Sequence, residues 1–408
     1  MTDSKPRKLP FPVVDNCLQI GGLPLTRLAQ RVGQTPFYAY DRALLTSSVK
    51  TLRAALPQQV RLHYSVKANP MPALVQHMAG MVDGCDVSSA GELKTVLDTV
   101  MAPEHVSFSG PGKREDELAR AIAAGILINV ESERELQRVA RIGDRLGILP
   151  RVALRINPDF ELKSSGMRMS GGAKQFGVDV EQAPQVLQQI GALGLDFFGL
   201  HVFSGSQCLK ADAIIEAQAR TLELAVRLSE HAPRAIRLLN MGGGFGVPYF
   251  AGESELDIHP IGEHLAQVLS RLEAEIPQAR LALELGRFIV SEAGIYVTRI
   301  VDRKVSRSQI FLVADGGMHH HLAASGNLGQ VIRKNYPILI GNRVEAPHAE
   351  KVSVVGSLCT PLDLIADKID LPPADIGDLV VVLQSGAYGL TASPTAFLGH
   401  PVPDEVLV

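Results

Sequence analysis

A lysine, an aspartate and an arginine each end a short β-favouring run, a place where an ionisable side chain needs a partner or a task. Lys67 ends the run in HYSVKANP, Asp86 the run in GCDVSSAGEL and Arg155 the run in RVALRINPD. Because strand residues alternate between two faces, His63, Ser65 and Lys67 are predicted to share one face. Taken singly, these residues also fit structural roles, such as a solvent-exposed lysine or an ordinary salt bridge.

Two glycine-containing motifs add the groups that a phosphate and a pyridine ring need. In MGGGFG, three consecutive glycines let backbone N–H groups approach a phosphate closely, although a bare glycine turn is the simpler alternative. Their spacing is not GxGxxG, so it does not predict a dinucleotide site. In ELGR, Glu284 offers an acid to a pyridine nitrogen and Arg287 a cation to a phosphate. With Lys67, these motifs predict a site for a phosphate-bearing pyridine cofactor.

The order of the predicted elements brings these residues together. Between about residues 60 and 286, β-rich runs alternate with helical patterns, which is the rhythm of βα units around a parallel sheet, and eight strands are enough to close a barrel. The loops at the carboxyl ends of barrel strands converge on one mouth, where the reactive residues are expected. The predicted strands are 62–67, 84–88, 106–110, 126–130, 151–157, 197–203, 236–241 and 280–285.

The pattern changes after Arg287. The segments GIYVTRIVDRKV, QIFLVADGG, EKVSVVGSLC and DLVVVLQSGAYG read as strands without long helices between them, which predicts a separate, largely antiparallel β-domain. The early segment TPFYAYD is also rich in β-favouring residues. We therefore predict an N-terminal segment of residues 1–43 that joins the β-domain, a barrel at 44–287 and the C-terminal β-domain at 288–408.

Composition excludes several classes of function. The 408 residues carry a formal net charge of −3, so the chain lacks the basic surplus that binds nucleic acid or anionic lipid. Neither a signal peptide nor a membrane span is predicted, which favours a cytoplasmic protein. The four cysteines are too scattered for a disulfide framework. The run His319–His321 does not predict a metal site, because adjacent residues of an extended segment point in alternating directions.

Seven motifs of this chain stand in the order found in one known family. They are YSVKAN, DVSSAGEL, HVFSGSQ, GGGFG, ELGR, SLCTPLD and QSGAYG. The chain resembles the fold-type III pyridoxal-phosphate decarboxylases, the group of diaminopimelate and ornithine decarboxylases, and is most similar to the branch associated with exosortase A genes. The resemblance implies an alanine-racemase-like (β/α)8 TIM barrel followed by an antiparallel β-domain.

The resemblance also implies a role for each motif residue. Lys67 would hold pyridoxal 5′-phosphate, Glu284 would hold the protonated pyridine nitrogen, and Cys359 would return a proton to Cα. The residues implied around the cofactor are Lys67, Asp86, Arg155, His201, Phe203, Ser206, Gly243, Gly244, Glu284, Gly286, Arg287 and Tyr388. Those implied around the substrate are Arg287, Arg333, Tyr336, Cys359, Thr360, Asp363 and Tyr388.

The implied reaction is α-decarboxylation of an amino acid. In the family it runs through an external aldimine on the cofactor, loss of carbon dioxide, a quinonoid and reprotonation at Cα. Because the motif around Cys359 serves the neighbouring subunit's active site in the family, the resemblance implies a homodimer with shared active sites.

Three departures from the family pattern concern the cofactor ring and the substrate. The family histidine two residues before the GSQ glycine is Phe203 here, with His201 two positions earlier, so either ring can cover the cofactor. Leu285 replaces a usual proline, a minor change. Thr360 stands where diaminopimelate decarboxylases have a glutamate, and their arginine and tyrosine after the DAGM-like motif are missing or moved to Arg333 and Tyr336.

Several activities remain open at this point. The substrate is either a free diamino acid, such as meso-diaminopimelate, lysine or ornithine, or an amino acid tethered to a carrier protein, as in the butirosin-type relatives. A racemase is disfavoured by the Cys359 motif. A catalytically silent regulator like the antizyme inhibitors is disfavoured because Lys67, Glu284, Arg287, Cys359 and Tyr388 are all present.

Overall fold

The computed structural model describes residues 9–330, 332–347 and 350–408, and these form two compact units. The barrel unit comprises Val49–Val247 and Ser254–Phe288. The β unit comprises the described residues up to Ser48, together with Pro248–Glu253 and Ile289–Val408. The predicted boundaries at residues 43/44 and 287/288 stay a prediction.

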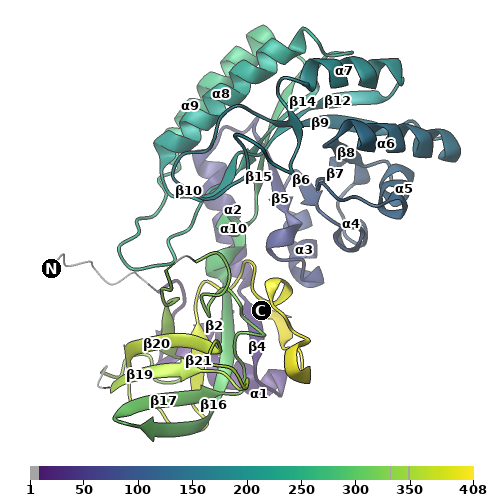
Figure 1. Cartoon of the computed structure of the whole chain (residues 1–408). Helices are drawn as coiled ribbons and strands as arrows, with labels where there is room; N and C mark the ends of the chain where they lie inside the picture. Colours follow the sequence, from purple (N-terminus) through teal and green to yellow (C-terminus); the bar gives the residue numbers. More distant parts are fainter. Residues whose placement is uncertain (1–8, 331, 348–349) are drawn as a thin grey trace. The chain divides into compact units, whose positions relative to one another are not determined.

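Eight parallel strands of the barrel unit, which is described throughout, close on themselves because β8 pairs with β9 (Figure 1). All eight predicted strands form, with ends shifted by at most two residues. A closed parallel barrel is therefore the fold of this unit. The strands are β5 (Arg61–Ser65), β6 (Gly84–Val87), β7 (Val106–Phe108), β8 (Leu127–Val130), β9 (Arg151–Asn157), β12 (Asp196–Val202), β14 (Leu238–Gly243) and β15 (Arg280–Leu285).

Helices between these strands cover the outside of the barrel, and α8 and α9 run side by side on it (Figure 1). Helix α6 shows why the chain turns where it does: the Ser132 hydroxyl accepts a hydrogen bond from the Glu135 N–H (3.1 Å), and Gly147 ends the helix at φ 64°. The helices are α2 (Arg42–Ala55), α3 (Pro72–Ala79), α4 (Ala90–Leu97), α5 (Glu115–Ala123), α6 (Glu133–Leu146), α7 (Ala183–Ala192), α8 (Ala211–Ser229), α9 (His259–Glu275) and α10 (Arg287–Val290).

Short elements complete the barrel unit. Two of them, β10 and β13, form an antiparallel ribbon, and β11 adds in parallel to β9. The short elements are η1 (Val66–Ala68), η2 (Pro103–His105), β10 (Ser165–Arg168), β11 (Val178–Asp179) and β13 (Gly205–Cys208).

An apolar layer closes the barrel interior at the amino ends of the strands. Leu127, Ala153, Leu238 and Ala282 form one buried cluster, and the half-buried Phe198 packs against it. These residues come from strands β8, β9, β14, β15 and β12. Layers of this kind make a TIM barrel a packed core and leave chemistry to the opposite, carboxyl ends of the strands.

The β unit is built around one sheet in the order β18-β21-β16-β17-β19-β20, with β4 paired to both β16 and β22. Most of these pairings are antiparallel, but β17 pairs with β19 and β4 with β22 in parallel, so the sheet is mixed. Its elements are β1 (Val13–Val14), β2 (Cys17–Ile20), β3 (Leu23–Pro24), α1 (Leu25–Val32), β4 (Phe37–Tyr40), η3 (Ser291–Ala293), β16 (Gly294–Ser306), β17 (Gln309–Ala314), β18 (Ile338–Ile340), β19 (Glu350–Val355), β20 (Leu364–Leu371), β21 (Leu379–Val382), η4 (Leu390–Ala392), η5 (Phe397–Gly399) and β22 (Asp404–Leu407).

The β unit has its own apolar core, to which β4 contributes Phe37 and Ala39 and β16 contributes Ile295 and Val297, all fully buried. None of the helices in the described residues combines the length and the apolar composition needed to cross a membrane.

Candidate active site

Lys67 lies just beyond a barrel strand and faces an aromatic ring. Strand β5 ends at Ser65, and Lys67 belongs to the 3-10 turn η1. The prediction that the strand continues to Lys67 is therefore wrong by two residues, because the chain turns at Val66. The Lys67 Nζ lies 5.1 Å from the centre of the Phe203 ring.

Glu284 is a buried acid at the end of β15 with two polar neighbours. Its Oε1 accepts a hydrogen bond from Asn240 Nδ2 (2.7 Å) and lies 3.0 Å from His201 Nε2. Burial alone would raise the pKa of Glu284, but the charge of His201, followed by Lys67 and Arg155, lowers it well below its usual range. Glu284 is therefore an anion in the barrel interior.

Asp86 on β6 is also buried, but its surroundings act in the opposite direction. Ser107 donates a hydrogen bond to its Oδ1, and His63 Nδ1 lies 3.5 Å from its Oδ2. Burial and the charge of Glu284 raise the pKa of Asp86, and the neighbouring histidine and serine offset only part of this effect. Two acids in one barrel thus have pKa values shifted apart, a pattern that marks functional sites.

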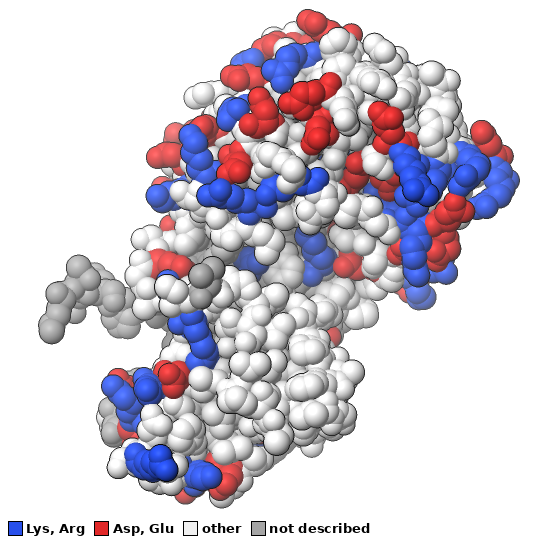
Figure 2. Space-filling view, viewed as in Figure 1, with Lys and Arg blue, Asp and Glu red and all other residues white. Residues whose placement is uncertain are grey.

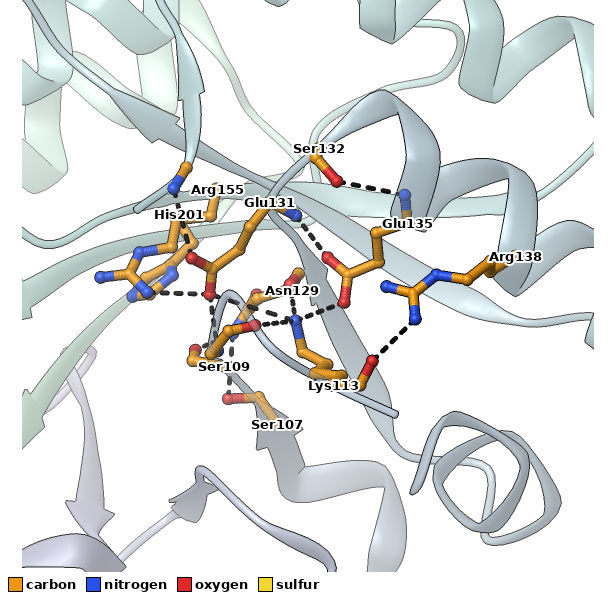
Figure 3. Close-up of polar contacts among 12 residues, drawn as sticks. Ser107, Ser109, Lys113, Asn129, Glu131, Ser132, Glu135, Arg138, Arg155 and His201 are labelled. Carbon is orange, nitrogen blue, oxygen red and sulfur yellow. Dashed lines mark hydrogen bonds and ion pairs between the residues drawn. The ribbon is translucent and has the colours of Figure 1, made fainter. Parts of the chain in front are cut away.

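Arg155 on β9 is held by an acid that sequence reasoning did not single out. Its Nη1 donates to Glu131 Oε1 at 2.8 Å, with both side chains less than a tenth exposed (Figure 3). The same Glu131 oxygen accepts the Gly110 N–H (2.6 Å), and Oε2 accepts the Gly177 N–H (3.2 Å). Glu131 thereby fixes where the guanidinium of Arg155 points.

Behind Glu131 lies a buried lysine, Lys113, whose side chain is 1% exposed. Its Nζ donates at 2.8 Å to the Gly110 carbonyl, the Asn129 carbonyl and Glu135 Oε1, which satisfies all three ammonium protons (Figure 3). Glu135 also accepts the Glu131 N–H through Oε2 (2.7 Å). The group is a closed polar network of two cations and two acids.

Tightly packed glycines form a cradle at the ends of β14 and β15. A Cβ on Gly243 would lie 2.0 Å from the Glu284 carbonyl oxygen, and one on Gly244 would lie 2.5 Å from the Gly205 carbonyl oxygen. Gly244 has φ 84°, and a Cβ on Gly286 would lie 2.8 Å from the Ala68 Cβ. At these positions a side chain would collide with neighbouring atoms. Glycine avoids this collision and lets a ligand approach the backbone N–H groups closely.

Two more of the predicted cofactor residues are close in sequence to the cradle glycines. Ser206 follows Gly205 in β13, opposite Met167 of β10, and Arg287 opens α10 directly after Gly286.

The site fits the predicted cofactor on the basis of its own atoms. His201 Nδ1 is a buried polar atom without a hydrogen-bond partner in the described residues, which signals a missing polar group. The lysine amine, the buried anion Glu284 and the glycine cradle supply what an aldehyde, a pyridine nitrogen and a phosphate require. The barrel unit therefore contains groups that fit pyridoxal 5′-phosphate.

The predicted residues of the SLCTPLD motif lie in the β unit. Asp363 is 3% exposed and its carboxylate accepts the backbone N–H groups of Met318 (2.6 Å) and Leu358 (2.8 Å). Burial raises the pKa of Asp363, and these hydrogen bonds offset part of that effect. Asp363 thus joins two turns, and Cys359, which directly follows Leu358 in the second turn, is exposed.

The residues predicted to replace the distal-end groups are engaged within the β unit. Arg333 donates from Nε to the Ser325 carbonyl (3.0 Å) and from Nη2 to the Leu364 carbonyl (2.6 Å). The ring of Tyr336 is buried, 4.9 Å from that of Tyr249 and 5.6 Å from that of His321. Tyr388 is half-buried and adopts a left-handed backbone with φ 52°.

The three consecutive histidines lie in a turn, not in the extended segment that the sequence led us to expect. The His320 N–H bonds to the Gly317 carbonyl at 2.9 Å, which defines the turn. His321 Nδ1 accepts the Ala324 N–H (3.2 Å), so its Nε2 carries the proton donated to Ser385 Oγ (3.0 Å). Burial lowers the pKa of His319 to about 4 and of His320 and His321 to about 3, so all three are neutral at pH 7.

Comparison with known proteins gives the same description of the barrel. Residues 42–291 match the family described as the pyridoxal-dependent decarboxylase, pyridoxal binding domain. The decarboxylase of L-glutamyl-BtrI acyl-carrier protein from Niallia circulans is 38% identical over 389 residues, covering 94% of this chain and 90% of that protein. Diaminopimelate decarboxylase from Aquifex aeolicus is 33% identical, covering 97% and 91%. The crystal structure of the Helicobacter pylori diaminopimelate decarboxylase with L-lysine has a TM-score of 0.83 at 26% identity and covers 94% of both chains.

The closed barrel, the lysine, the buried acid and the family match define the class: this chain belongs to the pyridoxal-dependent decarboxylases. It is a pyridoxal-phosphate-dependent amino-acid decarboxylase, as the resemblance implied. Its place in the branch associated with exosortase A genes stays a prediction.

Proposed function

We propose that this enzyme decarboxylates an amino acid whose distal end is joined to a carrier protein. The observation that carries the proposal is the engagement of Arg333, which is half-buried and whose guanidinium is bonded to two backbone carbonyls. A guanidinium held in this way shapes its own turn and is poorly placed to bind the charged end of a free diamino acid.

Thr360 supports the same conclusion. It stands where diaminopimelate decarboxylases have a glutamate, and its hydroxyl accepts the Leu362 N–H at 3.3 Å. A neutral hydroxyl does not balance the distal ammonium of meso-diaminopimelate, whereas an amide- or thioester-linked end carries no charge to balance. The similarity to the carrier-dependent decarboxylase of Niallia circulans is consistent with this substrate class.

The proposal assigns roles to the barrel residues. Lys67 holds the cofactor, Glu284 keeps its pyridine nitrogen protonated, and Gly243, Gly244 and Gly286 with Ser206 and Arg287 surround its phosphate. Phe203 covers the cofactor ring, because it is the ring that faces Lys67, whereas His201 lies against Glu284. Asp86 and Arg155 complete the polar surroundings. When bound, the cofactor supplies a ring that accepts the electron pair released with carbon dioxide.

Cys359 is proposed as the acid that returns a proton to Cα. Its exposure in the single chain suits a residue that serves another subunit, so we propose a homodimer with shared active sites. Asp363 would keep the Cys359 turn in place through its two backbone hydrogen bonds, and Tyr388 would contact cofactor and substrate.

Carbon dioxide release from a substrate panel tests the proposal. Cofactor-loaded protein is incubated with a glutamyl-loaded acyl carrier protein and, separately, with free glutamate, meso-diaminopimelate, lysine, ornithine and arginine. We expect release from the carrier-bound amino acid at least a hundredfold faster than from any free one, and none with Lys67→Ala. Fast release from free diaminopimelate with lysine as the product would overturn the proposal.

A further inference from the structure

Four arginines surround a hollow at the amino ends of the barrel strands, opposite the end that carries Lys67. Arg61, Arg151 and Arg280 are the first residues of β5, β9 and β15, and Arg237 directly precedes β14. The hollow has a volume of about 340 Å³, which is within the range of small-molecule sites. Over the face of the barrel unit seen in Figure 2, by contrast, basic and acidic side chains are intermixed.

The positive charge of this hollow is not balanced by its own acids. Glu104 is the acidic residue among those that line it, and Asp196 is bonded to Arg237 (2.5 Å). The four guanidiniums face these two carboxylates, while Asp83 near Arg61 is shared with Arg53, so positive charge is in excess among the described residues around the hollow. A multiply charged anion would neutralise that excess.

Arg61 and Arg280 carry most of that excess. They start neighbouring strands, since Arg61 pairs in register with Ala282 of β15, and neither has an ion pair or hydrogen bond from its side chain in the described residues. Asp83, an acid near Arg61, is already paired with Arg53 at 2.6 Å. Partial burial and the like charge of Arg280 lower the pKa of Arg61, and the charge of Asp83 offsets only part of this effect. An anion between the two guanidiniums would relieve their repulsion.

Arg151 and Arg237 are held in position on the other side of the hollow. The guanidinium carbon of Arg151 lies 4.6 Å from the centre of the Phe198 ring, and that of Arg237 lies 4.4 Å from it. Arg151 also donates to the Gly125 carbonyl (3.1 Å), and Arg237 to the Phe197 carbonyl (2.6 Å). Arg151 and Arg237 are therefore already positioned before any anion binds. This preorganisation lowers the entropic cost of binding.

The hollow is separate from the active site. Leu238, one of its lining residues, belongs to the apolar layer of Leu127, Ala153 and Ala282 that closes the barrel interior at this end. An anion bound here would be separated from Lys67 and Glu284 by that layer.

We propose that this hollow binds a small anion carrying two linked phosphate groups. Guanidinium forks match phosphate oxygens in pairs, and parallel strands lie about 4.8 Å apart, so cations on several strands span more than one phosphate. Phe198 is already covered by two arginines, which favours a free diphosphate over a ligand that needs an aromatic ring for stacking.

Isothermal titration of the cofactor-loaded enzyme with sodium pyrophosphate tests this site. We expect binding that weakens at least tenfold in the double variant R61Q/R280Q and that becomes weaker with added sodium chloride. The visible absorption of the bound cofactor should not change, which excludes competition at the cofactor phosphate. Because Arg61 and Arg280 have no described partner to lose, the double variant should melt at or above the wild-type temperature without pyrophosphate.

A matched control removes two exposed arginines from helix α6 in the variant R134Q/R145Q, which should bind pyrophosphate within twofold of the wild type. Adenosine diphosphate serves as a second ligand: binding as tight as that of pyrophosphate would extend the site to nucleoside diphosphates, and weaker binding would assign it to the free diphosphate. Absence of pyrophosphate binding, equal binding in R61Q/R280Q, or equally tight binding of citrate would overturn the proposal.

Discussion

Replacing Glu131 by glutamine removes one charge from the buried network that positions Arg155. The substituted amide would place an N–H₂ group near the Gly110 or Gly177 N–H, because both carboxylate oxygens of Glu131 now accept hydrogen bonds. Arg155 and Lys113 would keep their positive charges with only Glu135 between them. The substitution thus hardly changes the side-chain volume, but it leaves one buried cation of the network without an acidic partner.

The expected cost follows from the burial of the pair. Breaking a buried ion pair on one side costs about 3–5 kcal/mol, and the oxygen that glutamine retains places this case near about 3 kcal/mol. For a unit the size of this barrel, each kcal/mol lowers the melting temperature by about 2–4 °C. We therefore expect E131Q to melt about 6–12 °C below the wild type at pH 7.

Thermal melts followed by circular dichroism measure this difference, with E133Q as the control. Glu133 is exposed on the first turn of α6, so its loss should shift the melting temperature by less than about 2 °C. A shift in E131Q no larger than that in E133Q would refute the view that Glu131 balances the buried cations.

The pH dependence of the same shift provides a second test. Burial alone would raise the pKa of Glu131, but Arg155 and then Lys113 lower it below its usual range. An acid whose pKa is lower in the folded state than in the unfolded state stabilises the fold fully above its unfolded pKa of about 4.3. This stabilisation is lost as the pH falls through the pKa of the folded state. The gap between wild type and E131Q should therefore stay constant from pH 7 to about pH 5 and narrow below about pH 4. A gap that widens as the pH falls would contradict the charge assignment.

Three other substitutions test the cofactor and substrate assignments. K67A should abolish the visible absorption of the cofactor-loaded enzyme and all carbon dioxide release, and retention of the absorption would exclude Lys67 as the attachment point. G244A should lower affinity for the cofactor at least tenfold in a fluorescence titration, because its Cβ would lie 2.5 Å from the Gly205 carbonyl oxygen; unchanged affinity would exclude a tight cradle. T360E should raise kcat/KM for free diaminopimelate severalfold, and no gain would argue against a distal-end role for this position.

The barrel could be predicted because its sequence is consistent at several levels. Each strand is a short apolar run, each helix has apolar residues at helical spacing, and caps such as Ser132 mark where helices begin. The exact end of β5 could not be predicted, because YSVKAN continues the β pattern although the chain turns at Val66. The β unit was predicted as largely antiparallel, but the parallel pairing of β4 with the distant β22 leaves no local pattern.

Candidate-site residues could be predicted where they stand in recognised motifs. Residues that only position those side chains could not. Glu131 and Lys113 lie outside every motif, and charged residues outside apolar runs usually face solvent. Glu135 stands three residues after Ser132, a spacing that predicts a helix start, but its bond to Lys113 depends on a residue 22 positions away. Asn240 could have been found, since a polar side chain inside the apolar strand LLNMGG needs a buried partner, here Glu284.

The buried network also bears on whether the barrel can be divided. Lys113, Glu131 and Glu135 precede β9, whereas Arg155 lies within it, so the network joins the first four barrel strands to the fifth. Of this network, a fragment ending at Pro150 would keep two acids and one base, and the remaining fragment would contain Arg155 without Glu131. Neither half keeps a balanced set of these charges, so we expect two co-expressed fragments cut at this point to be soluble only when they reassemble the barrel.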